Sequence, residues 1–557
     1  MATNTDPKHF LATSGETEPV WIHTEPYSRR PQFPTLGQDL KTDVCVIGSG
    51  IAGIQSAYEL VKRGHEVVMV EARDILSGET GRTSGHLASA LDDGYANIAK
   101  VHGDKGAVLA AKSHSWAIDR VGEIARELNI ECEYRKLPGY QVSQYDRNTQ
   151  PKEHNDDVEE LKAEVAKAQL LKMKAEYREG FAVKGWDGKP DQRDAAVFFG
   201  QGAFHPTKYL VGILDWLKKQ PNFSCYTNSR VLEVSEKGIS VPLVTDNKHV
   251  VIKTESGQTI DCKSAIMATC VPLQKLSVIA EMEYMRTYCV AIRVPKGTVE
   301  DCLLYDSAEA YKYIRLTHCD EEHDYMIVGG CDHKVGQEDS VGRFAELETW
   351  TRERFPSAGS VDYAWSGQVF EPVDYMAFIG LDPGTSHTYI ATGDSGNGLT
   401  HGVLAGRLLA DEIESKPNDW SDLYHPQRKA SIVKRAGTML AHDLQINSQY
   451  KRFLQSDIAD IEDLANGEGG VMNNTKTGKP TAIYKDDAGK THSFSALCPH
   501  MKGVVCWNRT EKSWDCPVHG SRFSKDGVCV IGPAKGNLEP MDEGGKQTQG
   551  QTAAAAA

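Results

Sequence analysis

The sequence predicts a large domain of mixed α/β (α+β) structure followed by a small all-β domain. The chain has 557 residues, well beyond the ~250–300 at which one hydrophobic core stops growing, so we expect at least two domains. Residues 44–70 run as apolar strand, Gly-rich turn, helix and apolar strand, the pattern of a Rossmann-like βαβ unit. From about residue 457 the pattern changes to short strands and turns, which is typical of a small β-domain.

The other segments divide the chain in order. Residues 1–40 are polar and contain several Pro, which predicts an extended N-terminal arm. Residues 41–426 form the α/β domain, and helical periodicity within it marks 107–131 and 155–177. Its later elements are predicted as strands at 231–234, 250–252, 265–268, 325–328 and 389–391 and a helix at 404–413. A helical linker is predicted at 427–456 and the β-domain at 457–543. The last residues, 544–557, are predicted to be a disordered tail.

Composition excludes several classes of protein. The formal net charge of −15 argues against binding to nucleic acid or an anionic membrane, because both require basic patches. No run approaches the ~18 apolar residues of a membrane span, and the first residues lack the layout of a secretory signal. Thirteen cysteines without such a signal favour reduced thiols. We therefore expect a soluble, cytoplasmic protein.

A Gly-rich turn follows the first strand directly and opens a helix. The residues of this turn are Gly48, Gly50, Ile51, Ala52 and Gly53. The first Gly permits the tight turn, the second lets the backbone approach a pyrophosphate, and the third lets the helix pack on the strand. Glu71 ends the second strand, where a carboxylate accepts hydrogen bonds from an adenosine ribose. The ordered set predicts a dinucleotide site, and the alternative is an ordinary tight turn.

Two more segments indicate which dinucleotide is bound. The first continues after Glu71 with Ala72, Arg73, Gly78, Thr80, Gly81, Arg82, Thr83 and Ser84. The second follows strand 389–391 and contains Gly393, Gly396, Gly398, Leu399 and Thr400. With these motifs, residues 40–415 resemble the D-amino-acid-oxidase/glycine-oxidase-like flavoprotein superfamily, which implies FAD and an inserted substrate sheet. The resemblance places the first segment at the FAD pyrophosphate, the second beside the flavin and the backbone of Val231 at the adenine. No second Gly-x-Gly-x-x-Gly follows a strand, which disfavours NAD(P)H as reductant.

The C-terminal domain carries a second constellation, Cys498-Pro-His500 followed by Cys516-Pro-Val-His519. Two Cys and two His can hold a tetrahedral structural zinc. In a Rieske [2Fe–2S] centre, two thiolates hold one iron and two imidazoles hold the other. The Cys-x-His spacing is unusual for zinc fingers, and the string from Cys516 to Phe523 resembles Rieske proteins over about residues 457–540. The resemblance implies that Cys498, His500, Cys516 and His519 ligate the cluster and that Ser521 donates toward its sulfur.

The motif departs from high-potential Rieske proteins, which carry a disulfide between the two cluster loops. The matching positions here are Gly503 and Val518, so that bridge cannot form. We expect a reducible, ferredoxin-like centre toward the lower part of the ~ −150 to +300 mV range. Cys506 and Cys529 are interpreted as free thiols in a small core.

The pairing of the two domains resembles DadA-type FAD-dependent oxidoreductases with a C-terminal Rieske domain. This resemblance implies oxidation of an amine or amino-acid-like C–N bond by hydride transfer to FAD. The electrons would then pass singly through the cluster to an external acceptor or O₂. One alternative is an electron-transfer module that serves a partner enzyme without its own substrate. Another is a zinc-stabilised flavoprotein oxidase. A Rieske oxygenase would need a mononuclear iron held by two His and a carboxylate in a following domain, and residues 520–557 contain no His.

The residues that act on substrate are not determined by the sequence. His86 and His401 are candidates near the flavin, with packing or helix capping as the alternative. Structural roles are expected for His205 and His333. Tyr284, Arg286 and Tyr288 fall in a segment that can line the substrate sheet, where Arg would suit a carboxylate, but we interpret them as solvated surface.

Overall fold

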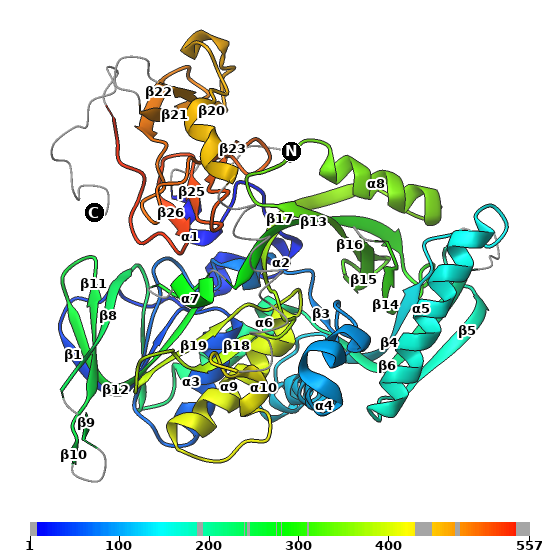
Figure 1. Ribbon diagram of the computed structural model, residues 1–557, viewed down its shortest axis with the longest axis horizontal. Helices are drawn as coiled ribbons and strands as arrows, with labels where there is room; N and C mark the ends of the chain where they lie inside the picture. The colour runs from blue at the N-terminus through cyan, green and yellow to red at the C-terminus, as the bar shows by residue number, and fades with distance from the viewer. Residues whose placement is uncertain are drawn as a thin grey trace.

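The computed structural model describes residues 8–186, 193–238, 240–241, 245–273, 276–279, 281–308, 311–428, 448–473 and 479–541. Figure 1 shows a sheet covered by helices at the lower left, a second sheet at the right, and a small β-domain, coloured orange to red, above both. Most of the predicted helical linker and the predicted tail lie outside the described residues. Within them, no helix is both long and apolar enough to cross a membrane.

The first sheet is the Rossmann-like part of the chain. Its strands run β18-β19-β12-β1-β2-β7, with β11 and β8 joined to β12 at the side. β1, β2, β7, β12 and β19 are parallel, as buried α/β strands usually are. The strands of this sheet are β1 Leu40–Ile47, β2 Val67–Val70, β7 Phe223–Tyr226, β8 Val231–Lys237, β11 His249–Thr254, β12 Thr259–Cys270, β18 Phe378–Leu381 and β19 Thr388–Thr392. The strands predicted in this region are thus confirmed.

Two helices that begin at Gly-rich turns cross closely on this sheet. They are α3 (Ile51–Lys62) and α9 (Gly398–Ile413). A Cβ at Gly402 would stand 2.4 Å from the Ile51 side chain, so α9 can approach α3 only because it carries glycine there. The other helices of this part are α4 Tyr95–Glu127, α6 Pro206–Leu217, α7 Leu276–Ile279 and α10 Ser421–Tyr424. Because α3 and α9 follow β1 and β19, their N-termini meet at one edge of the sheet.

The second sheet has nine strands in the order β17-β13-β16-β15-β14-β4-β6-β3, with β5 beside β6. These strands are β3 His86–Leu87, β4 Arg135–Val142, β5 Ala175–Phe181, β6 Arg193–Ala203, β13 Met282–Pro295, β14 Leu303–Asp306, β15 Lys312–His318, β16 His323–Lys334 and β17 Val361–Pro372. The associated helices are α5 Pro151–Leu170 and α8 Arg343–Arg354. The chain passes repeatedly between the two sheets, so this sheet is an insertion, as expected. A short pair, β9 Ser240–Val241 and β10 Thr245–Asp246, lies apart.

The C-terminal domain is all-β, as predicted. It contains a three-stranded and a four-stranded antiparallel sheet. The strands are β20 Glu468–Asn473, β21 Pro480–Lys485, β22 Thr491–Ser495, β23 Cys506–Asn508, β24 Ser513–Asp515, β25 Arg522–Ser524 and β26 Cys529–Ile531. Trp514 and Phe523 are fully buried in its core. Short 3₁₀ turns at Gln449–Leu454 and Ile461–Asp463 precede the domain.

The N-terminal segment lies between the domains instead of extending away from them. It forms α1 (His9–Ala12), α2 (Val20–Thr24) and a 3₁₀ turn at Tyr27–Arg29. Trp21 is fully buried, and its indole N–H donates to the carbonyl of Thr83 at 2.7 Å. The prediction of an extended arm is therefore wrong for residues 8–39, because a few apolar side chains outweigh the polar composition once they reach a core.

Buried ion pairs join the β-domain to the rest of the protein. Arg82 donates to Glu511 at 2.6 Å, and Arg286 donates to Asp515 at 2.6 Å. All four side chains are almost fully excluded from water. Burial alone would raise the pKa of Glu511, but Arg82 and Arg522 lower it to about 2. The β-domain is thus held in one position by fully desolvated charges.

Two sequence predictions need correction here. Arg286 and Tyr288 are fully buried, and Arg286 faces the β-domain, so the interpretation of this segment as solvated surface is wrong. The sequence signal was ambiguous because the partner carboxylate of Asp515 lies more than two hundred residues away along the chain. The helix predicted at 155–177 ends at Leu170, and β5 begins at Ala175.

Removing the charge of one interdomain carboxylate should destabilise the protein strongly. We expect Glu511→Gln to cost about 3–5 kcal/mol, because it leaves Arg82 buried without a counter-charge. Glu338→Gln is the matched control, since Glu338 forms an exposed pair with Arg343, and should cost no more than about 1 kcal/mol. Denaturant unfolding measures both, and equal losses would contradict the assigned role of the interface.

The same carboxylates should make the interface sensitive to acid. The pKa values of Glu511 and Asp515 are lowered to about 2 from ordinary values of 4.5 and 3.8. Their contribution to stability is therefore complete above about pH 4.5 and is lost as the pH falls toward 2. Thermal unfolding followed between pH 5 and pH 2 should show this loss, and Glu511→Gln should reduce it.

Candidate functional site

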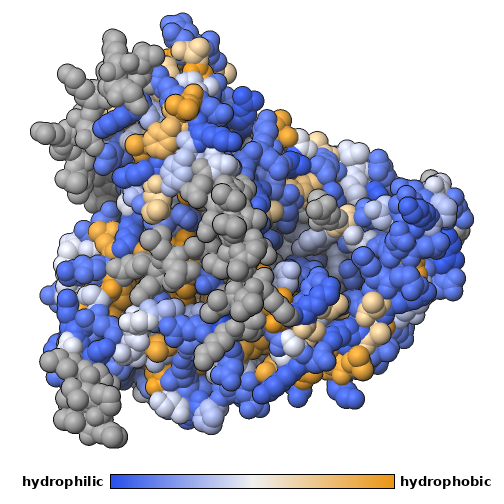
Figure 2. Space-filling view, viewed as in Figure 1, coloured by the Kyte–Doolittle hydropathy of each residue, from blue (hydrophilic) through white to orange (hydrophobic). Residues whose placement is uncertain are grey.

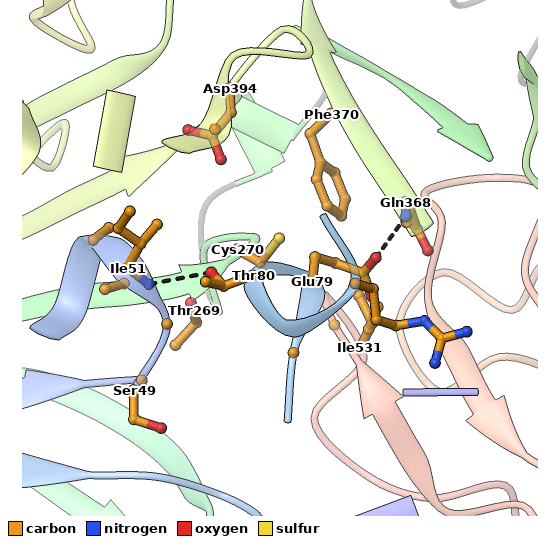
Figure 3. A pocket seen from close by; sticks show the side chains of 18 of the residues that line it. Ser49, Ile51, Glu79, Thr80, Thr269, Cys270, Gln368, Phe370, Asp394 and Ile531 are labelled. Carbon is orange, nitrogen blue, oxygen red and sulfur yellow. Dashed lines mark hydrogen bonds between the residues drawn. The ribbon is translucent and has the colours of Figure 1, made fainter. Parts of the chain in front are cut away.

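A cavity of about 290 Å³ lies where the Gly-rich turns of α3 and α9, the second sheet and the β-domain meet. Figure 3 shows Ser49 and Ile51 on one side of it and Gln368 and Ile531 on the other, with Asp394 opposite Ser49. Segments far apart in sequence thus contribute to one cavity.

The first Gly-rich turn leaves room in the cavity for a ligand. Gly48 has φ +107°, and a Cβ there would stand 2.3 Å from the carbonyl of Ala268. A Cβ at Gly53 would stand 2.0 Å from the carbonyl of Gly48. These positions therefore require glycine for the turn and for close packing of helix on strand. Gly50, whose Cβ would point at Thr80, lies in the cavity wall between them.

An acid and a hydroxyl hold this turn in position. The carboxylate of Glu71 accepts from both the backbone N–H and the hydroxyl of Ser49 at 2.9 Å. The hydroxyl of Thr80 accepts from the N–H of Ile51 at 3.1 Å (Figure 3). The second loop thereby reaches the N-terminus of α3, where N–H groups and the helix dipole favour an anion.

The structure brings most of the predicted cofactor-binding residues into the cavity wall. These are Gly48, Gly50, Ile51, Ala52, Glu71, Ala72, Arg73, Gly78, Thr80, Arg82, Thr83, Ser84, Val231, Gly396, Gly398 and Leu399. The predicted residues outside this lining are Gly53, Gly81, Gly393 and Thr400. Gly53 and Gly81 shape the turns, because a Cβ at either would meet backbone oxygen. Thr400 is buried and bonds His114 at 2.8 Å.

Sequence reasoning missed part of the wall. Thr287 of β13, Tyr313 of β15 and Gln368 of β17 line the cavity from the second sheet. The β-domain contributes Val530, Ile531, Gly532, Ala534 and Lys535. Alternation of polar and apolar residues along the strands gave no signal for the first group, since both faces of a covered sheet are buried. Only docking of the domains brings in the second group.

The four candidate histidines lie in different surroundings. His86 lines the cavity, and burial together with Arg315 lowers its pKa to about 3, so its imidazole is neutral. His401 is fully buried and contacts the carbonyl of Asp394 at 2.9 Å, outside the cavity lining. His205 caps α6, and His333 bonds the hydroxyl of Tyr288. The structural roles expected for His205 and His333 agree with these contacts.

The predicted cluster ligands lie together at one end of the β-domain. The imidazole rings of His500 and His519 are 5.0 Å apart, centre to centre. Cys498 hydrogen-bonds to Cys516, and this bond and nearby N–H groups lower the pKa of Cys498 below its ordinary value. A Cβ at Gly503 would stand 2.4 Å from Val518, so the two cluster loops touch where a disulfide is excluded by residue type. Ser521 is buried and accepts from the N–H of Ala534 at 3.0 Å.

One residue links this end of the β-domain to the cavity. The side-chain amide of Gln368 donates to the carbonyl of Gly520 at 2.8 Å, and Gly520 follows His519 directly. The backbone N–H of Gln368 donates to Glu79 of the second loop at 2.6 Å (Figure 3). The ring of Tyr284 lies edge-on to that of His519, with centres 6.2 Å apart. The four-ligand pocket therefore adjoins the cavity.

Comparison with known families now identifies the two parts. A family model described as FAD dependent oxidoreductase matches residues 43–412, and one described as Rieske [2Fe-2S] domain matches residues 455–542. The chain belongs to the FAD-dependent oxidoreductase family. This oxidoreductase carries FAD and a Rieske cluster as its cofactors, and its C-terminal domain is a Rieske domain. The zinc alternative is thereby set aside.

Relatives share one or both parts of the oxidoreductase. It is 27% identical to YhfW of Bacillus subtilis, which is named as a Rieske 2Fe-2S iron-sulfur protein, over 96% of this chain and 99% of the relative. It is also 27% identical to gamma-glutamylputrescine oxidoreductase of Escherichia coli, over 70% of this chain and 88% of the relative.

Solved structures share the fold of the first part. Glycine oxidase of Geobacillus kaustophilus superposes with a TM-score of 0.54 at 17% identity, covering 68% of this chain and 96% of that one. L-amino acid deaminase of Proteus vulgaris superposes with a TM-score of 0.52 at 18% identity, covering 71% and 100%. At this identity the likeness establishes the fold alone.

The residues present fit both cofactors. The glycines of the α3 turn permit the tight turn and the close packing of helix on strand, because a Cβ at Gly48 or Gly53 would meet a backbone carbonyl. This turn leads to the N-terminus of α3, where a pyrophosphate can bind. Two thiols in contact beside two imidazoles in contact match the paired ligand set of a Rieske cluster. We propose that the cavity residues named above hold FAD and that Cys498, His500, Cys516 and His519 ligate the iron pair.

Distorting the Gly-rich turn before α3 should remove flavin from the oxidoreductase. In Gly53→Ala the new methyl group would meet the Gly48 carbonyl at 2.0 Å, so the turn must shift. We expect purified Gly53→Ala to retain less than about a tenth of the wild-type FAD, measured by flavin absorbance per chain. Gly37→Ala is the control, because nothing lies within 4 Å of a Cβ there. Full flavin content in Gly53→Ala would contradict the proposed role of this turn in holding FAD.

Removing one cluster ligand should abolish the iron–sulfur centre. We expect Cys498→Ser to lose iron and acid-labile sulfide together, because a hydroxyl is a poor substitute for an iron-ligating thiolate. Cys506→Ser is the matched control, since Cys506 is a thiol of the same domain outside the ligand set. Metal and sulfide analysis measures both variants. Zinc without sulfide in the wild-type protein would overturn the assignment.

Proposed function

We propose that this protein oxidises the C–N bond of an amine or amino-acid-like substrate and passes the electrons to an external acceptor. The substrate C–H bond would break with transfer of a hydride to FAD, a proton would leave the nitrogen, and a C=N bond would form. The two electrons would then leave one at a time through the Rieske cluster to a one-electron acceptor. Together the cofactors supply two-electron chemistry at the cavity and one-electron transfer at the Rieske domain.

Family membership supports the amine part of this proposal. The relative from Escherichia coli is named as acting on gamma-glutamylputrescine, and structural neighbours are named as amino-acid oxidases and deaminases. His86 is neutral in the cavity wall, and its ring nitrogens contact the hydroxyl of Ser84 and the carbonyl of Ile314, so it can orient this part of the wall. Residues 530–535 cover the cavity from the Rieske side and would exclude water from a bound ligand.

The observation that carries the relay is the contact between the two sites. Gln368 touches the residue after the cluster ligand His519 and also lines the cavity. The buried pairs Arg82–Glu511 and Arg286–Asp515 hold this contact in place. A fixed contact between the two parts of the chain would favour electron exchange within one molecule over exchange with a mobile carrier.

Anaerobic mixing of the holoprotein with a panel of amines and amino acids tests the proposal. We expect at least one compound to bleach the oxidised flavin band and then to produce the electron paramagnetic resonance signal of a reduced [2Fe–2S] cluster. In Cys498→Ser, the same compound should bleach the flavin without producing that signal. If no compound bleaches the flavin while a reduced ferredoxin does, the protein is an electron-transfer module instead. Bleaching without any cluster signal in the wild type would contradict the relay.

A further inference from the structure

A group of carboxyls lies beside one end of the cavity, where the Gly-rich turn before α9 meets the second sheet, and Asp394 of this group lines the cavity itself. Asp394 and Gly396 of that turn and Thr287 and Tyr313 of the sheet line the cavity there. We call this the acidic chamber and define it by five carboxyls, Asp92, Asp93, Asp332, Glu371 and Asp394. They come from the segment after β3, from β16, from β17 and from the turn itself.

Contacts connect these carboxyls to the cavity wall. A Cβ at Gly396 would stand 2.1 Å from an oxygen of Asp92, which also accepts from the hydroxyl of Tyr311 at 3.0 Å. Asp93 accepts from Ser395 at 2.7 Å. Asp92 lies deep in the fold and is nevertheless exposed to water, so the chamber is open to solvent and small ligands.

The carboxyls of the chamber are not neutralised by the protein. In the described part of the chain, none of the five forms an ion pair, and the buried oxygen Oδ1 of Asp332 has no hydrogen-bond partner. The neighbouring cation, Lys312, is paired with Glu346 at 2.9 Å. Burial, together with Asp93 and the other acids, raises the pKa of Glu371 to about 8, and burial raises that of Asp394 to about 7. Burial raises the pKa of Asp332 to about 6, although Thr287 and Lys312 act to lower it. Burial thus outweighs the stabilisation of the ionised form that the protein supplies at these three groups.

Among the described residues, none of the basic side chains of the cavity wall forms an ion pair with the five carboxyls. Arg73 and Arg82 donate to main-chain carbonyls of the N-terminal segment. Arg230 donates to the carbonyl of Cys529, and Lys535 belongs to the same Rieske loop. Arg315 lies behind His86 with its guanidinium donating to the carbonyls of Gly85, Phe204 and Leu316. The arginine that would suit a carboxylate, Arg286, is committed to Asp515.

From this charge distribution we propose that the substrate is an aliphatic diamine or polyamine whose distal ammonium group binds in the acidic chamber. The inference rests on the proposed amine oxidation and narrows its substrate class. The distal ammonium supplies the missing counter-charge and donates to oxygens such as Asp332 Oδ1. The reacting carbon is thereby held toward the Gly-rich turns. Binding of a zwitterionic amino acid is disfavoured, because its carboxylate would face five acids without a cation.

The test compares three probes on the holoprotein at one pH: 1,4-diaminobutane, n-butylamine and glycine. Binding is measured by perturbation of the flavin absorbance, and reduction by anaerobic bleaching. We expect 1,4-diaminobutane to bind at least about tenfold more tightly than n-butylamine, the effect of one charge-assisted hydrogen bond. Glycine should bind more weakly than either amine.

Two variants test whether the carboxyls of the acidic chamber cause the preference for the diamine. Asp332→Asn with Glu371→Gln should reduce the preference for the diamine over the monoamine to less than about threefold. Glu348→Gln, an acid on the exposed face of α8, should leave the preference unchanged. If the double variant does not fold, the ratio of the wild-type affinities for 1,4-diaminobutane and n-butylamine decides the test alone.

The outcomes separate the inference from the proposed function. Tight diamine binding that depends on the two acids, without bleaching by any amine, would keep the chamber as a diamine site and reject the oxidation. Bleaching by glycine with no diamine preference would keep the oxidation and overturn this inference. Equal affinity for diamine and monoamine in the wild type would overturn it as well.

Discussion

The structure depends on a layer of desolvated charge between the Rieske domain and the flavin-binding part. Arg82 faces Glu511, and Arg286 faces Asp515, with almost no access of water to either pair. Such pairs contribute little net stability compared with apolar contacts, but they are strongly destabilising when one partner is missing. They therefore act as a positional constraint. The proposed cluster ligands are thereby fixed next to Gln368 and Tyr284. The loop of the Rieske domain that carries Ile531 closes the cavity (Figure 3).

The same constraint explains the N-terminal segment. Thr17 donates to Glu511, and Arg82 donates to Thr13, so residues of this segment complete the polar shell of the interdomain pair. Trp21 seals the segment onto the loop that carries Thr83. On the face shown in Figure 2, hydrophilic residues predominate, with only small hydrophobic patches. The interactions that organise the molecule are internal.

The cavity is electrostatically divided along its length. The α3 turn presents N–H groups and glycine, which suit phosphate, whereas the far end presents carboxyls. An anionic group can thus bind at the α3 turn, and a cationic group can bind at the opposite end of the same cavity. The arginines that surround the cavity stabilise loops and domain contacts, so their number is a poor guide to the charge of the substrate.

By itself the sequence determined the local features: the strand, turn and helix around Gly48, the second loop through Ser84, the paired Cys and His from which the cluster ligands are proposed, and the all-β character of the C-terminal domain. Each is encoded over a few neighbouring residues, through glycine conformation, hydrophobic periodicity or ligand spacing, and can be predicted without the rest of the fold. The tertiary structure alone decided the partner of Arg286, the place of Gln368 between two sites, the folding of residues 8–39 and the clustering of the five acids. These depend on side chains brought together from distant segments, and the free energy of burying a charge depends on neighbours that local sequence does not specify.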